Sequence, residues 1–122
     1  MTKIKEFNLI DVRKNSSIVN TLNKVFKLWG YEKVSPSMIN NIETIKSSGV
    51  INQDELVSLV SNKSLCLRPE MTTSIVKLIS TRLINKKRPL RLWNNGTIFE
   101  KEKGLKNSYK LNERIQSGIE LI

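Results

Sequence analysis

Two strand-like segments near the carboxyl end, residues 90–100 and 112–122, constrain the fold more than any other part of the sequence. A lysine-rich segment joins them, which predicts an antiparallel hairpin. In the second segment, RIQSGIEL, the side chains of Ile115, Ile119 and Leu121 point to one face and polar side chains point to the other. An isolated hairpin is at best marginally stable in water, so more sheet must lie beside it.

The segments before the hairpin show mostly helical spacing, which makes the expected fold α+β, with helices first and the hairpin last. Serine, proline and glycine mark the boundaries of the expected elements. In chain order, we expect a helix over 18–29 capped by Ser16 or Ser17 and closed by Gly30, a strand over 31–34, a helix opened by Ser35 and Pro36 that buries Ile39, Ile42 and Ile45, a turn at Gly49, a short helix over 54–60, a strand over 64–67 and a helix from Met71 to near Asn85.

The composition excludes several classes of function. A chain of 122 residues makes one small domain. It contains no histidine and only Cys66, so an internal disulfide, a Cys/His zinc site and histidine acid–base catalysis are all excluded. We expect no metal and no cofactor. No apolar run is long enough to span a bilayer and no signal peptide precedes the first charges, so the expected compartment is the cytoplasm.

The formal net charge of +10 raises the question of nucleic-acid binding. Lysines outnumber arginines 15 to 6, however, whereas arginine is the usual reader of phosphates and base edges. The abundance of Lys, Asn and Ile is typical of AT-rich coding sequence. We therefore do not expect nucleic acid to be the main partner, and the run Lys86, Lys87 and Arg88 can be read as a solvated loop.

The polar face of the last strand is a candidate binding surface. Gln116 and Glu120 flank Gly118 on this face, so an amide and a carboxylate border a position without a side chain. Such a slot can hold an amine or an imidazole. The partner strand places Asn94 and Gly96 on one face, so glycines are expected to meet across the hairpin and open a shallow cavity. The alternative is an ordinary half-exposed strand with a polar outer face.

The segment LCLRPEMTTS is a second candidate. Pro69 and Glu70 follow a strand and begin a helix, where proline and an acid are both favourable. An acid at this position can also bind a ligand ammonium, with Thr72 beside it. Helix capping alone explains the pattern equally well.

Taken together, four segments resemble a known family. KLWGYEKVSPSMIN, LRPEMT, RPLRLWNNGTIF and IQSGIELI occur in the order found in the catalytic core of histidyl-tRNA synthetase and its paralogue, the regulatory subunit of ATP phosphoribosyltransferase. The resemblance extends from about Val19 to Ile122. Methionine after the acid in LRPEMT is more similar to the regulatory subunits, because synthetases usually have glycine there.

The resemblance implies a class II aminoacyl-tRNA synthetase-like antiparallel sheet flanked by helices. Residues 1–122 would be the N-terminal part of that core domain, truncated in mid-strand before the third signature. It further implies a non-catalytic subunit that assembles with a short-form catalytic subunit. The catalytic subunit would perform the first step of histidine biosynthesis, and the complex would be subject to feedback by histidine. Glu70, Thr72, Gln116 and Glu120 would bind free histidine, and Pro36 would lie near the interface of a dimer.

One position departs from the synthetase pattern. Synthetases have an arginine where this chain has Glu100, and that arginine contacts the ATP phosphate and the amino-acid carboxylate. A carboxylate about 4 Å from a phosphate costs roughly 4 kcal/mol at an effective dielectric constant near 20. Asn112 also replaces a basic residue, so adenylate chemistry is expected to be lost at this degenerate nucleotide site. Alternatively, Glu100 is a surface residue that pairs with Lys101 or Lys103.

Three hypotheses remain open from the sequence: a non-catalytic regulatory subunit, a fragment of a histidyl-tRNA synthetase that activates histidine and charges tRNA, and a free-standing binding module. An arginine at position 100 and a glycine at position 71 would have favoured the synthetase. The residues present favour the regulatory subunit.

Overall fold

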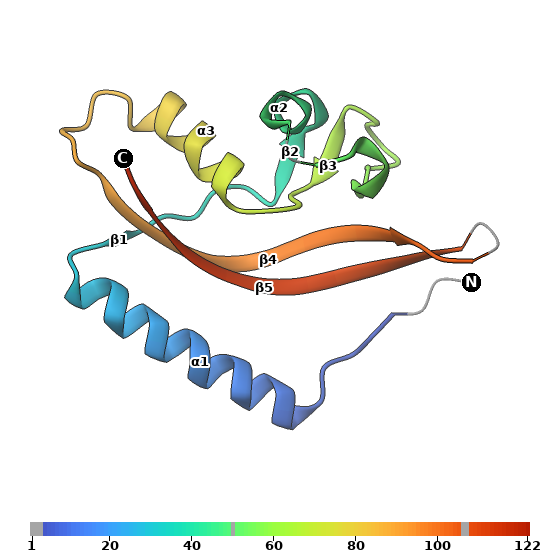
Figure 1. Cartoon of the computed structure of the whole chain (residues 1–122), viewed down its shortest axis with the longest axis horizontal. Helices are drawn as coiled ribbons and strands as arrows, with labels where there is room; N and C mark the ends of the chain where they lie inside the picture. The colour runs from blue at the N-terminus through green and yellow to red at the C-terminus, as the bar shows by residue number, and fades with distance from the viewer. Residues whose placement is uncertain (1–3, 50, 106–107) are drawn as a thin grey trace.

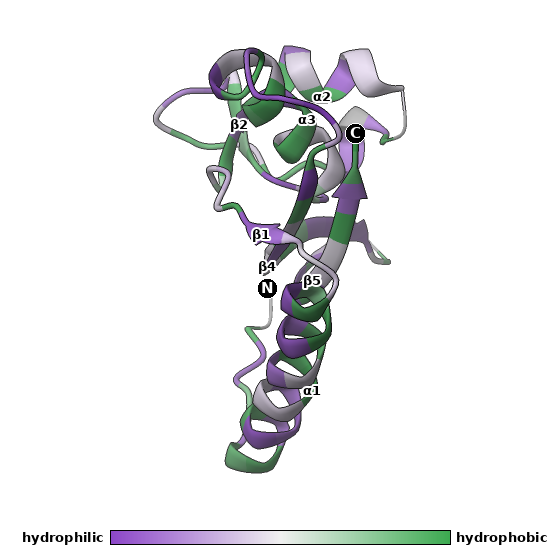
Figure 2. Cartoon of the chain, turned by 90° about the vertical axis from the view of Figure 1, so that its left-hand side faces the viewer, coloured by the Kyte–Doolittle hydropathy of each residue, from purple (hydrophilic) through white to green (hydrophobic). Residues whose placement is uncertain are grey.

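The computed structural model describes residues 4–49, 51–105 and 108–122, which form three layers (Figure 1). The middle layer is the hairpin of β4 (Arg91–Lys103) and β5 (Tyr109–Leu121). Helix α1 (Leu9–Leu28) lies on one side of it, and α3 (Thr72–Arg82) lies on the other side together with α2 (Ile42–Ser48). The view turned by 90° shows the same arrangement (Figure 2). The predicted α+β fold is confirmed.

The hairpin pairs residue by residue along its whole length, from Arg91 opposite Leu121 to Lys103 opposite Tyr109. The predicted additional sheet is present, because the short strand β1 (Glu32–Lys33) pairs in parallel with β4. Both strands are longer than predicted. Cross-strand side-chain contacts stabilise the added residues. One is a cation–π contact: the ammonium of Lys101 lies 4.8 Å from the ring centre of Tyr109.

Helix α1 begins at Leu9, well before the predicted cap at Ser16 or Ser17. Asn8 is the cap, and its side-chain oxygen accepts a hydrogen bond from the Asp11 amide at 2.8 Å. The helix buries none of its residues fully. It contacts the hairpin through a hydrogen bond of 2.7 Å from Asn95 to Asn23, and through the rings of Phe26 and Trp93, whose centres lie 5.7 Å apart.

The predicted helix starting at Pro36 is wrong. The chain instead forms strand β2 (Ile39–Asn41), which pairs antiparallel with β3 (Leu65–Leu67), and α2 begins only after it. The Ser–Pro signal for a helix start is overridden because β3 offers partners for this backbone. Ile39 consequently lies half exposed, whereas Ile42 and Ile45 are buried as predicted. The helix ends at Gly49, which is left-handed with φ of 69° and confirms the predicted turn.

Two further helix predictions need correction. Over 54–60 there is only the 3-10 turn η1 (Gln53–Glu55), since the next residues run along β3: the Leu59 amide donates to the Leu65 carbonyl, and the Leu67 amide donates to the Val57 carbonyl. This extended path lets Leu56 enter the core formed with Ile42, Ile45 and Cys66. Helix α3 ends at Arg82 rather than near Asn85.

A second core holds α3 against the hairpin. Met71, Ile75 and Ile79 pack on Leu92 of β4, with Ile98 at its margin. This packing places the first turn of α3 above the half of the hairpin that contains Gln116 and Glu120.

The side chain of Arg68 lies buried beside this core. Its Nε donates to the Thr97 carbonyl at 2.7 Å and its Nη1 donates to the Pro36 carbonyl at 3.1 Å, while the Arg68 carbonyl accepts from the Phe99 amide at 2.9 Å. The residue therefore connects the segment before β2, the end of β3 and the centre of β4.

The guanidinium of Arg68 requires glycine at position 96. A Cβ on Gly96 would lie 2.2 Å from Arg68 Nη2, whereas a Cβ on Gly118 would meet no atom within 4 Å. We expect Gly96→Ala to lower the free energy of unfolding by about 1–3 kcal/mol, because an anchored side chain must move. The matched Gly118→Ala variant should be neutral or slightly stabilising. Urea unfolding measures both, and equal effects would contradict the role of Gly96.

Candidate functional site

The face of the hairpin beneath α3 contains the residues that the sequence singled out on the last strand. Gly118 lies opposite Asn94, and the next pair along this face is Gln116 opposite Gly96. The prediction that the two glycines meet across the hairpin is therefore wrong by one pair. Arg68 covers Gly96, so only the position above Gly118 is open. The expected cavity is reduced to this one position.

The first turn of α3 closes over both sides of the open position. Gln116 Oε1 accepts a hydrogen bond from the Met71 amide at 3.0 Å, and Thr72 Oγ1 donates to Glu120 Oε1 at 2.9 Å. Three of the four predicted histidine contacts are thus brought together by direct bonds between α3 and β5. We call the space above Gly118, bounded by Thr72, Gln116 and Glu120, the Gly118 slot.

Glu70 lies at the start of the same helix. Its carboxylate oxygens accept from the Thr73 amide at 3.0 and 3.1 Å, so Glu70 caps α3. The helix-capping interpretation of Glu70 is confirmed, and a carboxylate retains further acceptor positions for a ligand.

The polar side chains of this region are mostly hydrogen-bond acceptors. Glu70 and Glu120 contribute two carboxylates, Gln116 contributes an amide and Thr72 a hydroxyl. Asn94, which pairs with Gly118 across the hairpin, is buried. Its Oδ1 has no hydrogen-bond partner in the described part of the chain and lies on the Gly96 side, 3.4 Å from where a Cβ on Gly96 would be. An ammonium with additional polar groups matches this set of acceptors.

Glu100 and Asn112 lie further along the hairpin, opposite one another. Glu100 Oε1 lies 2.9 Å from Arg114 Nη2, so the predicted pairing with Lys101 or Lys103 is wrong. The reason is the length of β4: the strand continues past Glu100, and its lysine neighbours point to the opposite face. Asn112 Nδ2 lies 3.4 Å from the Glu100 carboxylate and 3.3 Å from that of Glu102. Glu100 is therefore neutralised within the hairpin and takes no part in the Gly118 slot.

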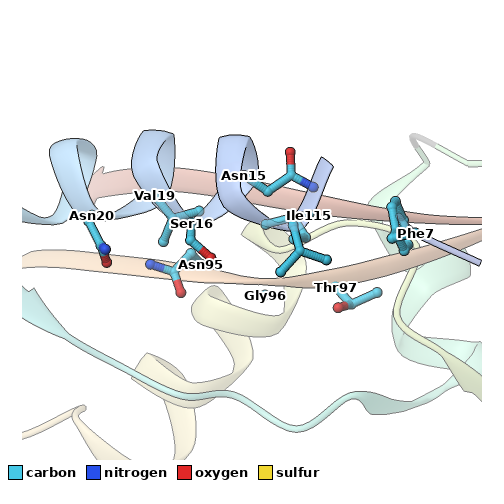
Figure 3. Close-up of a pocket in the computed structure, with 10 residues that line it drawn as sticks. Phe7, Asn15, Ser16, Val19, Asn20, Asn95, Gly96, Thr97 and Ile115 are labelled. Carbon is cyan, nitrogen blue, oxygen red and sulfur yellow. The ribbon is translucent and has the colours of Figure 1, made fainter. Parts of the chain in front are cut away.

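A cavity of about 410 Å³ lies on the other side of the hairpin, between α1 and the strands (Figure 3). Asn15 and Asn20 of α1 and Asn95 of β4 contribute amides to its lining, and Phe7 and Ile115 contribute apolar surface. The sequence analysis missed it, because it depends on how far α1 lies from the sheet. Its lining contains no titratable side chain, so it offers no acid–base chemistry.

Pro36, predicted to lie near a dimer interface, is buried, and its carbonyl accepts from Arg68. In the described ranges, no three His, Cys, Asp or Glu side chains gather as a metal site would require. Nor does any helix there have the length and apolar character needed to cross a membrane.

Comparison with known proteins identifies the family. The family model described as histidyl-tRNA synthetase matches residues 3–122. The chain belongs to the histidyl-tRNA synthetase family. Within it, the chain is 70% identical over 122 residues to the ATP phosphoribosyltransferase regulatory subunit of Prochlorococcus marinus strain MED4, and 44% identical over 118 residues to that of Prochlorococcus marinus strain SARG. These matches confirm the predicted resemblance to the regulatory subunits.

Solved structures confirm the predicted class II synthetase-like fold. An ATP phosphoribosyltransferase regulatory subunit/histidyl-tRNA synthetase from Bacillus halodurans superimposes with a TM-score of 0.81 over 97% of this chain and 30% of its own, at 24% identity. Histidyl-tRNA synthetase from Nostoc sp. PCC 7120 gives a TM-score of 0.78 over 98% of this chain and 27% of its own, at 17% identity. The chain spans about a third of the length of the curated relatives, 32% and 30% for the two Prochlorococcus proteins.

Proposed function

We propose that the protein is a non-catalytic regulatory subunit of ATP phosphoribosyltransferase and that it binds free histidine as a feedback ligand. The observation that supports this most directly is the Gly118 slot, in which Thr72, Gln116 and Glu120 gather around an open position, with Glu70 at the start of the same helix. The 70% identity to a protein named as such a regulatory subunit agrees with it.

In this proposal the ligand ammonium takes the acidic side of the slot. Glu120 and Glu70 compensate its charge, and Thr72 and Gln116 complete its hydrogen bonds. Charge-assisted hydrogen bonds of this kind are roughly twice as strong as neutral ones. The open position above Gly118 gives the ligand room to approach the sheet.

The partner in this proposal is a short-form catalytic subunit that performs the first step of histidine biosynthesis, in the cytoplasm. The relatives are named as regulatory subunits of ATP phosphoribosyltransferase, and a regulatory subunit implies a catalytic one. Residues 1–122 then form the N-terminal part of the synthetase-like core domain.

The synthetase alternative is less well supported. Glu100 stands in place of the arginine that adenylate formation needs, and its charge is compensated by Arg114. Met71 is buried in the core with Ile75 and Leu92, so the methionine that distinguishes this chain from the synthetases also has a structural role.

Calorimetry on the full-length protein tests the histidine site. Glu70→Gln removes the charge that faces the ammonium but keeps an acceptor for the Thr73 amide. A hydrogen bond to a charged group contributes roughly 1.5–3 kcal/mol, so histidine affinity should fall about ten- to a hundredfold. Gly118→Ala should also weaken binding, because its methyl group occupies the slot. Arg114→Gln, which changes the same face outside the slot, serves as the control. Unchanged affinity in both slot variants would contradict the site.

Pyrophosphate exchange tests the absence of catalysis. We expect the full-length protein to show no histidine-dependent ATP–pyrophosphate exchange above a protein-free blank, because position 100 carries a glutamate paired with Arg114 and offers no arginine to bind the phosphates. A histidyl-tRNA synthetase measured in parallel provides the positive control. Exchange well above the blank would contradict the non-catalytic role and favour the histidyl-tRNA synthetase alternative.

We also propose that the protein self-associates as a dimer through α1 and the neighbouring region around Pro36. Helix α1 and its C-cap residue leave apolar side chains in solvent, including Ile18 at 59% exposed and the C-cap Trp29 at 75%. Because Pro36 itself is buried, α1 provides the available surface. Sedimentation of the full-length protein at tens of micromolar should show a dimer, and Ile18→Glu should shift it toward monomer. A monomeric wild-type protein would overturn this proposal.

A further inference from the structure

We propose that Arg68 binds the carboxylate of the ligand in the Gly118 slot, and so supplies the contact that an arginine at position 100 would otherwise make. The inference rests on the proposed histidine site and identifies a specificity-determining residue within it. Three observations support it: how the guanidinium is held, its missing counter-ion and its position beside the slot.

Two of the guanidinium nitrogens, Nε and Nη1, hold the Arg68 side chain in place. Nε and Nη1 donate to the carbonyls of Thr97 and Pro36 at 2.7 and 3.1 Å. Arginine carries five N–H donors, so these two bonds leave the Nη2 group for another acceptor. Nη2 lies over Gly96, where it occupies the space of a missing side chain. The side chain is thus held in place with donors to spare.

The charge of Arg68 is not balanced by the chain around it. In the described ranges, the ion pair of the structure is between Arg114 and Glu100 and does not include Arg68. Arg68 is only 5% exposed. Desolvation by burial lowers its pKa from the ordinary value of an arginine, although the side chain stays charged at neutral pH. A buried cation held only by carbonyls is costly, and an anionic group beside it is stabilised.

The guanidinium of Arg68 lies next to the slot on the hairpin face. Gly96 pairs with Gln116, one step along this face from the pair of Asn94 and Gly118. Diagonal neighbours on one face of a hairpin lie roughly 7–8 Å apart, so Nη2 lies near the side of the slot that is away from Glu120. The slot then has an acidic end at Glu120 and Thr72 and a basic end at Arg68. Such a site selects a zwitterionic amino acid over an amine.

Calorimetry with two ligands separates this role from a structural one. The full-length protein is titrated with histidine and with histidinol, which keeps the ammonium and the imidazole but has no carboxylate. The wild type should bind histidine roughly ten- to a hundredfold more tightly than histidinol. In Arg68→Gln the affinity for histidine should fall close to that for histidinol, while the affinity for histidinol stays the same. Arg114→Gln, another arginine on this face, should keep the wild-type ratio.

A second variant covers the case in which Arg68→Gln does not fold. Gly96→Ala keeps an arginine at position 68 but pushes its Nη2 away from Gly96. It should therefore also reduce the preference for histidine over histidinol. If the folded variants keep the wild-type ratio of histidine to histidinol affinity, or lose both affinities equally, Arg68 does not bind the carboxylate. Either result would leave the proposed histidine site untouched. If the wild type binds neither ligand, the proposed histidine site is wrong and this inference is wrong with it.

Discussion

The hydrogen bonds of the buried Arg68 side chain determine how the parts of this chain fit together. They join the carbonyl of Pro36, before β2, to the carbonyl of Thr97, in the middle of β4. The Arg68 amide also donates to the Met38 carbonyl at 2.8 Å. The backbone bonds of Arg68, to the Met38 carbonyl and from the Phe99 amide, fix where α3 starts four residues later. The bonds from Met71 to Gln116 and from Thr72 to Glu120 depend on that start.

The hairpin separates two electrostatic environments along one face. At its outer end, Glu100 and Arg114 neutralise each other in partial contact with solvent, with exposed side-chain fractions of 41% and 64%. A pair this exposed contributes at most about 1 kcal/mol to stability. Nearer α3, Gln116 and Glu120 flank the open position at Gly118, and the buried guanidinium of Arg68 lies over the neighbouring Gly96. In the proposed function, the first place offers a nucleotide phosphate no free arginine, and the second place binds a small zwitterion.

The sequence predicted what depends on local pattern. Alternation identified the hairpin and placed Gln116, Gly118 and Glu120 on one face. The predicted helix start just after Glu70 was close, since α3 begins at Thr72 and Glu70 caps it. Long-range pairing overrode local signals elsewhere: β3 turned Ile39 into a strand residue and kept the segment after Glu55 extended. The burial of Arg68 was missed, since a charged side chain just after a strand gives no local sign that distant carbonyls will bury it. The cavity beside α1 was missed because helix spacing does not predict how closely a helix packs.

A crystal structure of the full-length protein with bound histidine is the most direct test of this account. We expect the ligand above Gly118, with its ammonium next to Glu120 and Thr72 and its carboxylate within hydrogen-bond distance of Arg68 Nη2. Histidine bound elsewhere, or bound with its carboxylate turned away from Arg68, would contradict the account.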